Sequence, residues 1–114
     1  MPFIGTKTNV ELNQEKKEII KQKLGQAISI IPGKSENWLM VSFEYVPDMY
    51  FKGNGDKPMA FVEVKVFGKV APSDFDKLTK EITSIISQEC SIEPSQIYIK
   101  YEEVSNWGWN GSNF

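Results

Sequence analysis

The chain has very few groups that could accept a proton near neutral pH. Its 114 residues include no histidine and a single cysteine, Cys90, which excludes Ser-His-Asp and Cys-His catalytic sites, a zinc finger and an intrachain disulfide. The sequence opens with Met1-Pro2, and removal of Met1 leaves Pro2 with a free secondary amine. Because an unperturbed α-amino group titrates at about pH 7.7 to 8, the Pro2 amine is the candidate catalytic base.

The composition is that of one soluble globular domain. Hydrophobic residues make up 40% of the chain and charged residues 25%, so neither disorder nor a membrane span is expected. A net charge of -2 offers no basic surface for nucleic acid, and no cofactor is expected. No signal-peptide pattern opens the sequence, which favours the cytoplasm and leaves secretion by another route open.

The chain is predicted to be one domain over residues 1–114, built from two pseudo-repeats, residues 1–57 and 58–114. The strand-like segment Phe3–Thr8 aligns with Phe61–Val66 at an offset of 58 residues. The same offset carries apolar positions of the first half onto apolar positions of the second: Ile20, Leu24, Ala27, Ile28, Leu39, Val41 and Phe43 onto Leu78, Ile82, Ile85, Ile86, Ile97, Ile99 and Tyr101. Three elements in one register indicate an internal duplication.

Each half is predicted to run strand, helix, strand. The first strand begins at the N-terminus, where a proline is tolerated. The first helix is expected to start after an Asn13 cap and to stop before Pro32, and the second to start after a Ser73 cap and to end near a buried Cys90. The remaining strands are expected at Trp38–Tyr45, Met59–Phe67 and Ile97–Glu102, with a turn-containing loop, Val46–Lys57, joining the halves.

A helix that joins two strands of one sheet makes those strands parallel and the crossover right-handed. The sequence therefore predicts an α/β (α+β) fold in which two βαβ units share a four-stranded mixed sheet, with both helices on one face. Large apolar residues occur on both faces of the predicted strands, for example Val64 on one face and Phe61 on the other. The face without helices is thus predicted to be covered in an oligomer.

Several motifs resemble the macrophage migration inhibitory factor (MIF) family of the tautomerase superfamily, from one end of the chain to the other. They are Met1-Pro2, Thr8-Asn9-Val10, Gly33-Lys34, Val46-Pro47-Asp48, Phe67-Gly68-Lys69, Ile97-Tyr98-Ile99 and the closing segment from Trp107 to Phe114. The resemblance implies a homotrimer with active sites at subunit boundaries. It also implies keto–enol tautomerisation of phenylpyruvate-like or dopachrome-like acids, with the N-terminal proline as base.

The resemblance assigns a role to each matching position. Lys34 is implied to bind the substrate carboxylate and, together with an apolar pocket, to lower the pKa of the Pro2 amine. The backbone N–H of Phe67 is implied to donate a second bond to that carboxylate. Tyr98 of an adjacent subunit is implied to reach the carbonyl that becomes the enol oxygen. The aromatic wall of the pocket is assigned to Trp109, with Trp107, Trp38 and Phe114 as further candidates.

Other positions depart from the family pattern. Met59 and Val62 replace a Cys-x-x-Cys motif, so thiol oxidoreductase activity is not expected. Lys100 replaces an asparagine that contacts substrate, and Lys65 replaces a histidine. These lysines could favour anionic substrates, or could form ordinary ion pairs with Glu63 and Glu102; the sequence leaves both readings open.

Two classes of function therefore remain: a cofactor-free tautomerase, which requires a free Pro2 amine, and a secreted cytokine-like ligand with a vestigial pocket. The polar and aromatic residues at the pocket positions favour the enzyme. Leu12 replaces an arginine implicated in receptor contact, which weakens the case for a receptor. Hydratase or dehalogenase chemistry, as in distant branches of the superfamily, is less favoured because those branches carry other charged partners.

Overall fold

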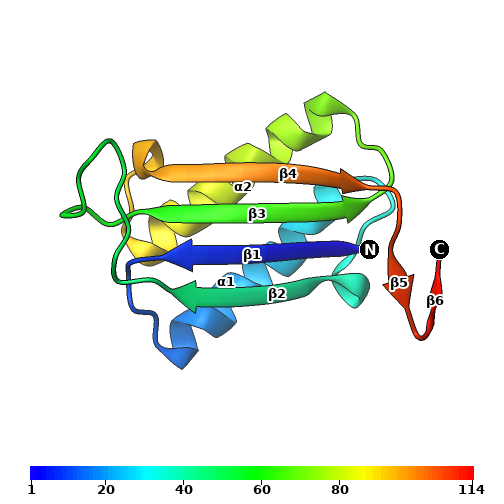
Figure 1. Ribbon diagram of the computed structural model, residues 1–114, viewed down its shortest axis with the longest axis horizontal. Coiled ribbons are helices and arrows are strands. Elements are labelled where there is room, and N and C mark those ends of the chain that lie inside the picture. Colours follow the sequence, from blue (N-terminus) through cyan, green and yellow to red (C-terminus); the bar gives the residue numbers. More distant parts are fainter.

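Four strands form one mixed sheet in the computed structural model, which describes residues 1–114 (Figure 1). They are β1 (Pro2–Thr8), β2 (Met40–Tyr45), β3 (Ala60–Phe67) and β4 (Ile97–Val104), in the spatial order β2-β1-β3-β4. The outer pairs, β1 with β2 and β3 with β4, are parallel, and the central pair of β1 with β3 is antiparallel. The predicted mixed sheet is confirmed.

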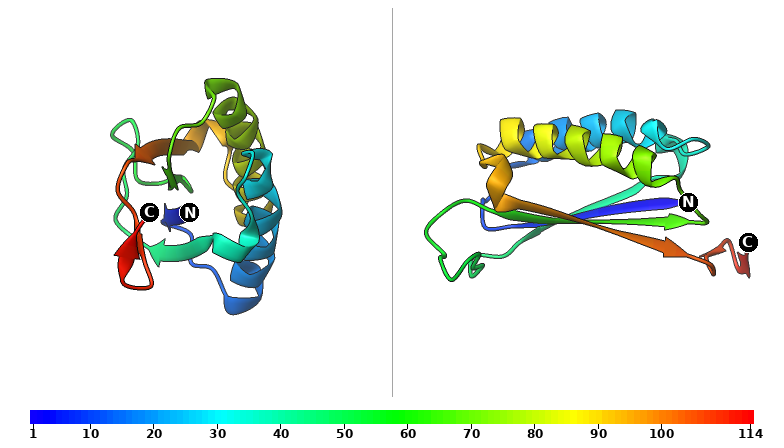
Figure 2. Two further views of the ribbon diagram at one scale, coloured as in Figure 1. Left: turned by 90° about the vertical axis from the view of Figure 1, so that its right-hand side faces the viewer. Right: turned by 90° about the horizontal axis from the view of Figure 1, so that it is seen from above.

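Both long helices, α1 (Gln14–Ala27) and α2 (Pro72–Cys90), cover the same face of the sheet, as Figure 2 shows. Their apolar stripes pack on alternate residues of the strands because a strand presents every second side chain to one face. The core consists of buried residues from both halves, including Ile4, Ile20, Leu24, Ile28, Val62, Val64, Val66, Leu78, Ile82 and Ile86. No helix combines the length and the apolar character that a bilayer-spanning helix needs.

The predicted start of the first helix is confirmed, and that of the second is wrong. The Asn13 side chain accepts a hydrogen bond from the Lys16 N–H at 2.8 Å, which satisfies one orphan donor of the first turn. In α2 the N-cap is Ala71, with no side-chain cap bond, and Ser73 lies inside the helix. Pro72 stands at the first helical position, where its missing N–H has no cost and its fixed φ fits the helix.

The strand bounds differ from the prediction in β2, β3 and β4; β3 begins one residue later than predicted, at Ala60. Trp38 does not begin β2 but closes a short 3₁₀ turn, η2 (Glu36–Trp38), whereas β4 continues two residues beyond Glu102. The C-terminal segment also forms a hairpin that was not predicted, between β5 (Gly108–Trp109) and β6 (Ser112–Asn113). Its turn is Asn110-Gly111, with both φ angles positive, the combination that a two-residue hairpin turn favours.

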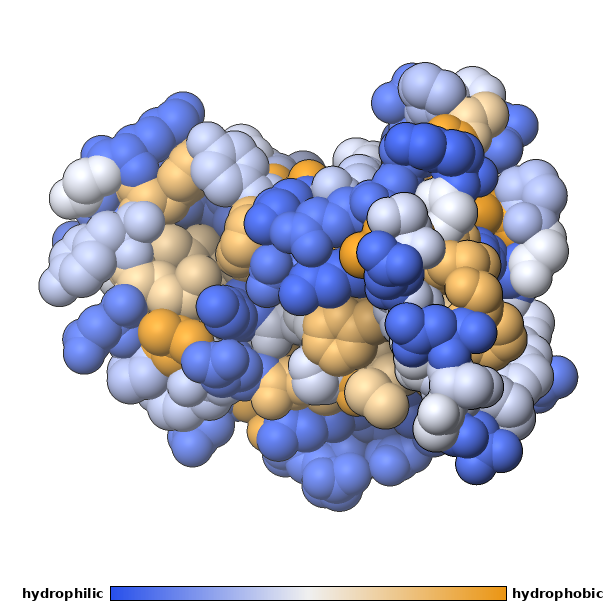
Figure 3. Space-filling model, turned by 45° about the vertical axis from the view of Figure 1, so that its right-hand side comes forward, coloured by the Kyte–Doolittle hydropathy of each residue, from blue (hydrophilic) through white to orange (hydrophobic).

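The sheet face without helices carries rows of side chains set by the strand register. Near the N-terminus the row is Met40, Phe3, Lys65 and Glu102; in the middle it is Ser42, Gly5, Glu63 and Lys100; at the far end it is Glu44, Lys7, Phe61 and Tyr98. The sequence predicted large apolar residues on this face. The structure has them at its two ends, but charged residues stand in every row, so the face is not continuously apolar. Figure 3 shows hydrophobic side chains interrupted by hydrophilic ones on this side.

Thr8 and Asn9 attach the end of β1 to the long loop before β3. Thr8 Oγ1 donates to the Met59 carbonyl at 2.8 Å and accepts from the Val10 N–H at 3.1 Å. The Asn9 side chain bonds the Lys57 carbonyl and the Met59 N–H, both at 2.9 Å. These bonds fix the loop whose aromatic residues lie beside Tyr98.

Thr6 and Thr8 provide a matched test of these contacts, because both are 2% exposed on the same face of β1. The Thr6 hydroxyl has no hydrogen-bond partner, whereas the Thr8 hydroxyl has two. We expect Thr8→Val to lower the free energy of unfolding by about 1–3 kcal/mol, and Thr6→Val to leave it unchanged or to raise it by up to about 1 kcal/mol. Urea denaturation at one protein concentration measures both; equal destabilisation would contradict the assignment.

Candidate functional site

A cavity of about 730 Å³ opens at the end of the sheet where the chain begins. Its volume is in the range of small-molecule sites. It is lined by residues from β1, β2, β3, the η2 turn and the C-terminal hairpin: Met1, Pro2, Phe3, Asn37, Trp38, Leu39, Met40, Lys65, Trp107, Gly108 and Trp109. Segments far apart in the sequence therefore meet around Pro2.

The antiparallel pairing of β1 with β3 positions Pro2. Pro2 lies opposite Val66, and the following Phe67 N–H donates to the Met1 carbonyl at 3.1 Å. With Met1 attached, the Pro2 nitrogen is a tertiary amide and has no basicity. Removal of Met1 would create the Pro2 amine at this point and leave the Phe67 N–H free.

Lys34 reaches the same point from the turn that follows α1. Gly33 has a φ of 81°, which glycine adopts at little cost, and the Lys34 N–H donates to the Ile31 carbonyl at 3.1 Å. The Lys34 Nζ donates to the Phe67 carbonyl at 2.9 Å. Burial lowers the pKa of the Met1 amine, and the neighbouring Lys34 ammonium lowers it further, because both disfavour the charged form of an amine.

Aromatic rings form one side of the cavity and continue around its edge. Trp38 and Trp109 meet edge to face, with ring centroids 5.0 Å apart. Phe114 lies 6.3 Å from Trp109 and 5.8 Å from Phe67, centroid to centroid. Trp109 and Phe114 are both about half exposed, so these rings are available to a planar ligand. Of the predicted site residues, the structure brings Pro2, Trp38 and Trp109 together in the cavity. Lys34 bonds the Phe67 carbonyl, and the Phe67 N–H bonds the Met1 carbonyl next to Pro2.

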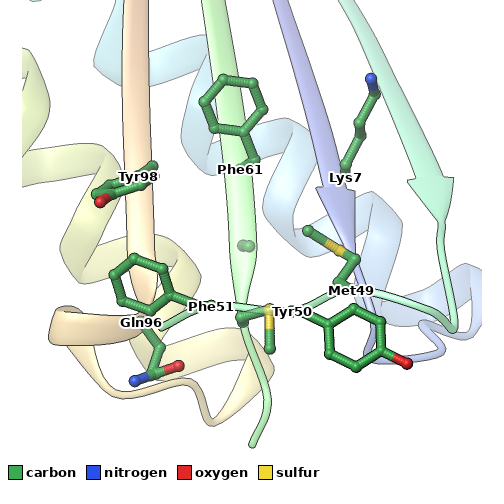
Figure 4. Close-up of a pocket in the computed structure, with 9 residues that line it drawn as sticks. Lys7, Met49, Tyr50, Phe51, Phe61, Gln96 and Tyr98 are labelled. Atoms are coloured by element: carbon green, nitrogen blue, oxygen red, sulfur yellow. The ribbon is translucent and has the colours of Figure 1, made fainter. Parts of the chain in front are cut away.

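Tyr98 lies at the opposite end of the sheet. It pairs with Phe61, five residues before Val66 on β3, which places it roughly 17 Å along the strands from Pro2. It packs edge to face on Phe51 at 4.9 Å and lines a separate cavity of about 270 Å³. Figure 4 shows Tyr98, Phe61 and Lys7 on neighbouring strands, with Phe51 and other loop side chains beside them.

Lys65 and Lys100, the two lysines that depart from the family pattern, differ in their contacts. Lys100 lies 2.8 Å from Glu102 and 3.7 Å from Glu63, nitrogen to oxygen, so it forms ion pairs across the open face. Lys65 forms no ion pair; its Nζ lies 5.8 Å from the centroid of the Phe3 ring, at the wall of the large cavity. Within a single chain, Lys65 therefore lies close to Pro2, whereas Lys100 lies farther away along the sheet.

Several cavity residues were not predicted. Phe3 and Met40 lie on the sheet face away from the helices. The alternation of apolar residues in the strands indicated that face, but it did not indicate that these two side chains lie near Pro2. Asn37 and Leu39 gave no signal, because the η2 turn that brings them to the cavity replaces the predicted start of a strand.

Cys90 is not part of this site. It is 6% exposed at the end of α2, and burial raises the pKa of its thiol to about 11, so it is not a reactive thiolate. The prediction of a buried cysteine at the end of the second helix is confirmed. No group of three or more histidine, cysteine, aspartate or glutamate side chains converges in a way that could hold a metal ion.

Comparisons with known proteins agree with this architecture. The family model described as macrophage migration inhibitory factor (MIF) matches residues 1–114. The macrophage migration inhibitory factor of Rattus norvegicus is 30% identical over 118 residues, covering 100% of this chain and 99% of the rat protein. The crystal structure of Leishmania major MIF2 is 33% identical, with a TM-score of 0.92, and the match covers 100% of this chain and 97% of that chain.

A similar result comes from a cyanobacterial structure. The macrophage migration inhibitory factor homologue from Prochlorococcus marinus is 30% identical, with a TM-score of 0.86, and the match covers 98% of each chain. The family model and these relatives all span nearly the full length. This chain therefore belongs to the macrophage migration inhibitory factor family.

Proposed function

We propose that the chain is a cofactor-free keto–enol tautomerase of phenylpyruvate-like α-keto acids with Pro2 as the base, and that the same recognition of a ring and a carboxylate extends to dopachrome-like acids. The observation that carries the proposal is the position of Pro2 at an aromatic cavity, next to the Met1 amine, whose pKa is lowered by burial and by the neighbouring Lys34. A lowered pKa favours the unprotonated form of an amine, which is the form that a general base needs.

In the proposed reaction the processed Pro2 amine takes a proton from C3 of the keto acid, and the C2 carbonyl oxygen receives a proton to give the enol. The reverse sequence returns the ketone. The substrate carboxylate takes the place that the Met1 carbonyl holds, accepting from the Phe67 N–H, with Lys34 as its cation. An ammonium and a backbone N–H supply a charge-assisted clamp on this carboxylate, and the tryptophans hold the ring.

The proposal also requires a second copy of the chain. Tyr98 is the candidate donor to the C2 oxygen, yet in one chain it lies at the far end of the sheet from Pro2. A homotrimer in which Tyr98 and Lys100 of one subunit lie at the Pro2 cavity of the next would complete three equivalent sites. The apolar ends of the open sheet face, with Met40 and Tyr98 more than half exposed, favour such an assembly.

Replacing Pro2 tests the base directly. We expect Pro2→Gly to lower kcat/KM for phenylpyruvate tautomerisation by about 10²-fold or more, because a positioned general base contributes 10²–10⁴-fold. Intact mass must show that Met1 has been removed from both proteins. A matched control is the wild-type chain with one residue added before Met1, which retains Lys34 and the aromatic wall but has no Pro2 amine; it should be equally impaired. Inactive wild-type protein, or a fully active variant, would reject the proposal.

Replacing Lys34 tests its proposed effects on the pKa of the Pro2 amine and on the binding of the substrate carboxylate. In Lys34→Met the Pro2 amine loses a neighbouring cation, so its pKa should rise and the acidic limb of the kcat/KM profile should move to higher pH. Loss of the contact between Lys34 and the substrate carboxylate should also lower the plateau value of kcat/KM by at least about tenfold. Lys80→Met, on the exposed side of α2, is the control. An acidic limb at the wild-type position would show that Lys34 does not set the Pro2 pKa.

Mixing two variants tests the shared site. In a trimer with Pro2 and Tyr98 contributed by neighbouring subunits, an equal mixture of Pro2→Gly and Tyr98→Ala chains, refolded together, should regain about a quarter of the intact sites. Sedimentation at micromolar concentration should give the mass of a trimer. A monomer, or mixed assemblies no more active than the average of the two variants, would contradict subunit-shared sites.

A second candidate is cytokine-like signalling, favoured by the name of the rat relative, a macrophage migration inhibitory factor. A ligand of this kind needs the folded surface but neither a free Pro2 amine nor an open cavity. The Pro2→Gly measurement therefore separates the two functions, since only the enzyme depends on that amine.

A further inference from the structure

The Pro2 cavity is lined by one lysine, Lys65, and the proposed reaction does not use it. Lys65 lies on β3 directly opposite Phe3 of β1, on the sheet face without helices, and its side chain lines the cavity together with Pro2. Its Nζ is 5.8 Å from the centroid of the Phe3 ring. The apolar stem of a lysine packs on such a ring while its ammonium stays at the polar end, so the charge is held at the cavity wall.

Lys65 forms no ion pair within the chain, unlike Lys100. Its nearest acidic neighbour across β4 is Glu102, but Glu102 forms its ion pair with Lys100 at 2.8 Å, and Glu63 also lies beside Lys100 at 3.7 Å. Lys100 therefore makes the close contacts with both carboxylates, and it lowers the pKa of the Glu102 carboxyl more than the charge of Lys65 does. An unpaired ammonium beside an apolar wall attracts an anion more strongly than one in open solvent.

Lys65 is also separate from the carboxylate clamp. Lys34 is anchored to the carbonyl of Phe67, two residues beyond Lys65 on β3, which corresponds to roughly 7 Å along the strand. The two lysines come from different segments, and Pro2 lies opposite the intervening Val66. A ligand whose first anionic group is bound at Lys34 would thus extend across the cavity wall on which Lys65 lies.

We propose that Lys65 selects α-keto acids whose tail carries a second anionic group. This inference rests on the proposed tautomerase function and narrows its substrate class, from arylpyruvates in general to α-keto dicarboxylic acids with a ring or chain between the two carboxylates. The ring packs against the tryptophans, the keto-acid end is bound at Lys34 and Phe67, and the distal carboxylate pairs with Lys65. A compact ammonium suits a single such group.

Binding can be measured without turnover, because all three tryptophans of the chain, Trp38, Trp107 and Trp109, line the cavity. Tryptophan fluorescence titrations with 3-phenylpropionate and 3-(4-carboxyphenyl)propionate compare one and two carboxylates on the same frame. We expect the wild type to bind the dicarboxylate on the order of fivefold more tightly at low salt, with the preference falling as salt is added. Lys65→Gln should abolish the preference, Lys65→Arg should retain it, and Lys77→Gln, an equal charge change on α2, should leave it unchanged.

Turnover separates this inference from the one on which it rests. Phenylpyruvate and 4-carboxyphenylpyruvate should both be tautomerised, with a kcat/KM ratio that follows the binding ratio in wild type and in Lys65→Gln. A wild type that turns over both acids but shows no preference, or a preference that survives Lys65→Gln, overturns the role of Lys65 alone. A Lys65-dependent binding preference without turnover of either acid supports Lys65 as the anion site and rejects the tautomerase.

Discussion

The antiparallel pairing of β1 with β3 is the contact on which the rest of this structure depends. It joins the two βαβ halves at the centre of the sheet, and it sets the first residues of the chain against the last residue of β3. The main chain of Phe67 then binds two segments, donating to the Met1 carbonyl and accepting from the Lys34 ammonium. These bonds fix the positions of Met1 and Lys34 at the end of β3.

The same pairing explains why one chain holds only part of the proposed site. Since β4 runs parallel to β3, its first residues lie at the opposite end from Pro2, and Tyr98 is directed to the loop that Thr8 and Asn9 attach. The open face separates these ends by a row containing Glu63 and Lys100. Apolar groups at both ends and paired charges between them suit a face that meets neighbouring copies at its ends, which is the arrangement that the proposed trimer requires.

The sequence predicted the elements well where a local rule decides them. The Asn13 cap, the two apolar helix stripes and the 58-residue repeat led to the observed mixed sheet. The prediction was wrong where a neighbouring group overrides the rule: Pro72 is already suited to the first helical position, so Ser73 does not act as the cap. Trp38 has the character of a strand residue, but its backbone forms a 3₁₀ turn and its ring packs on Trp109 of a hairpin 71 positions later. The residues next to Trp38 in the sequence do not indicate a contact with a segment so far along the chain.

The two unusual lysines show most clearly what sequence alone could not decide. Both stand on the open face beside glutamates, and the sequence allowed the same ion pairs for each. Register decides between them, because Lys100 lies opposite Glu63 and is two residues before Glu102 on its own strand, so that it contacts both carboxylates. Lys65 faces the same Glu102 from the neighbouring strand but packs over Phe3 instead. Lys100 therefore forms ion pairs within the sheet, whereas Lys65 forms none and lies at the wall of the cavity that contains Pro2.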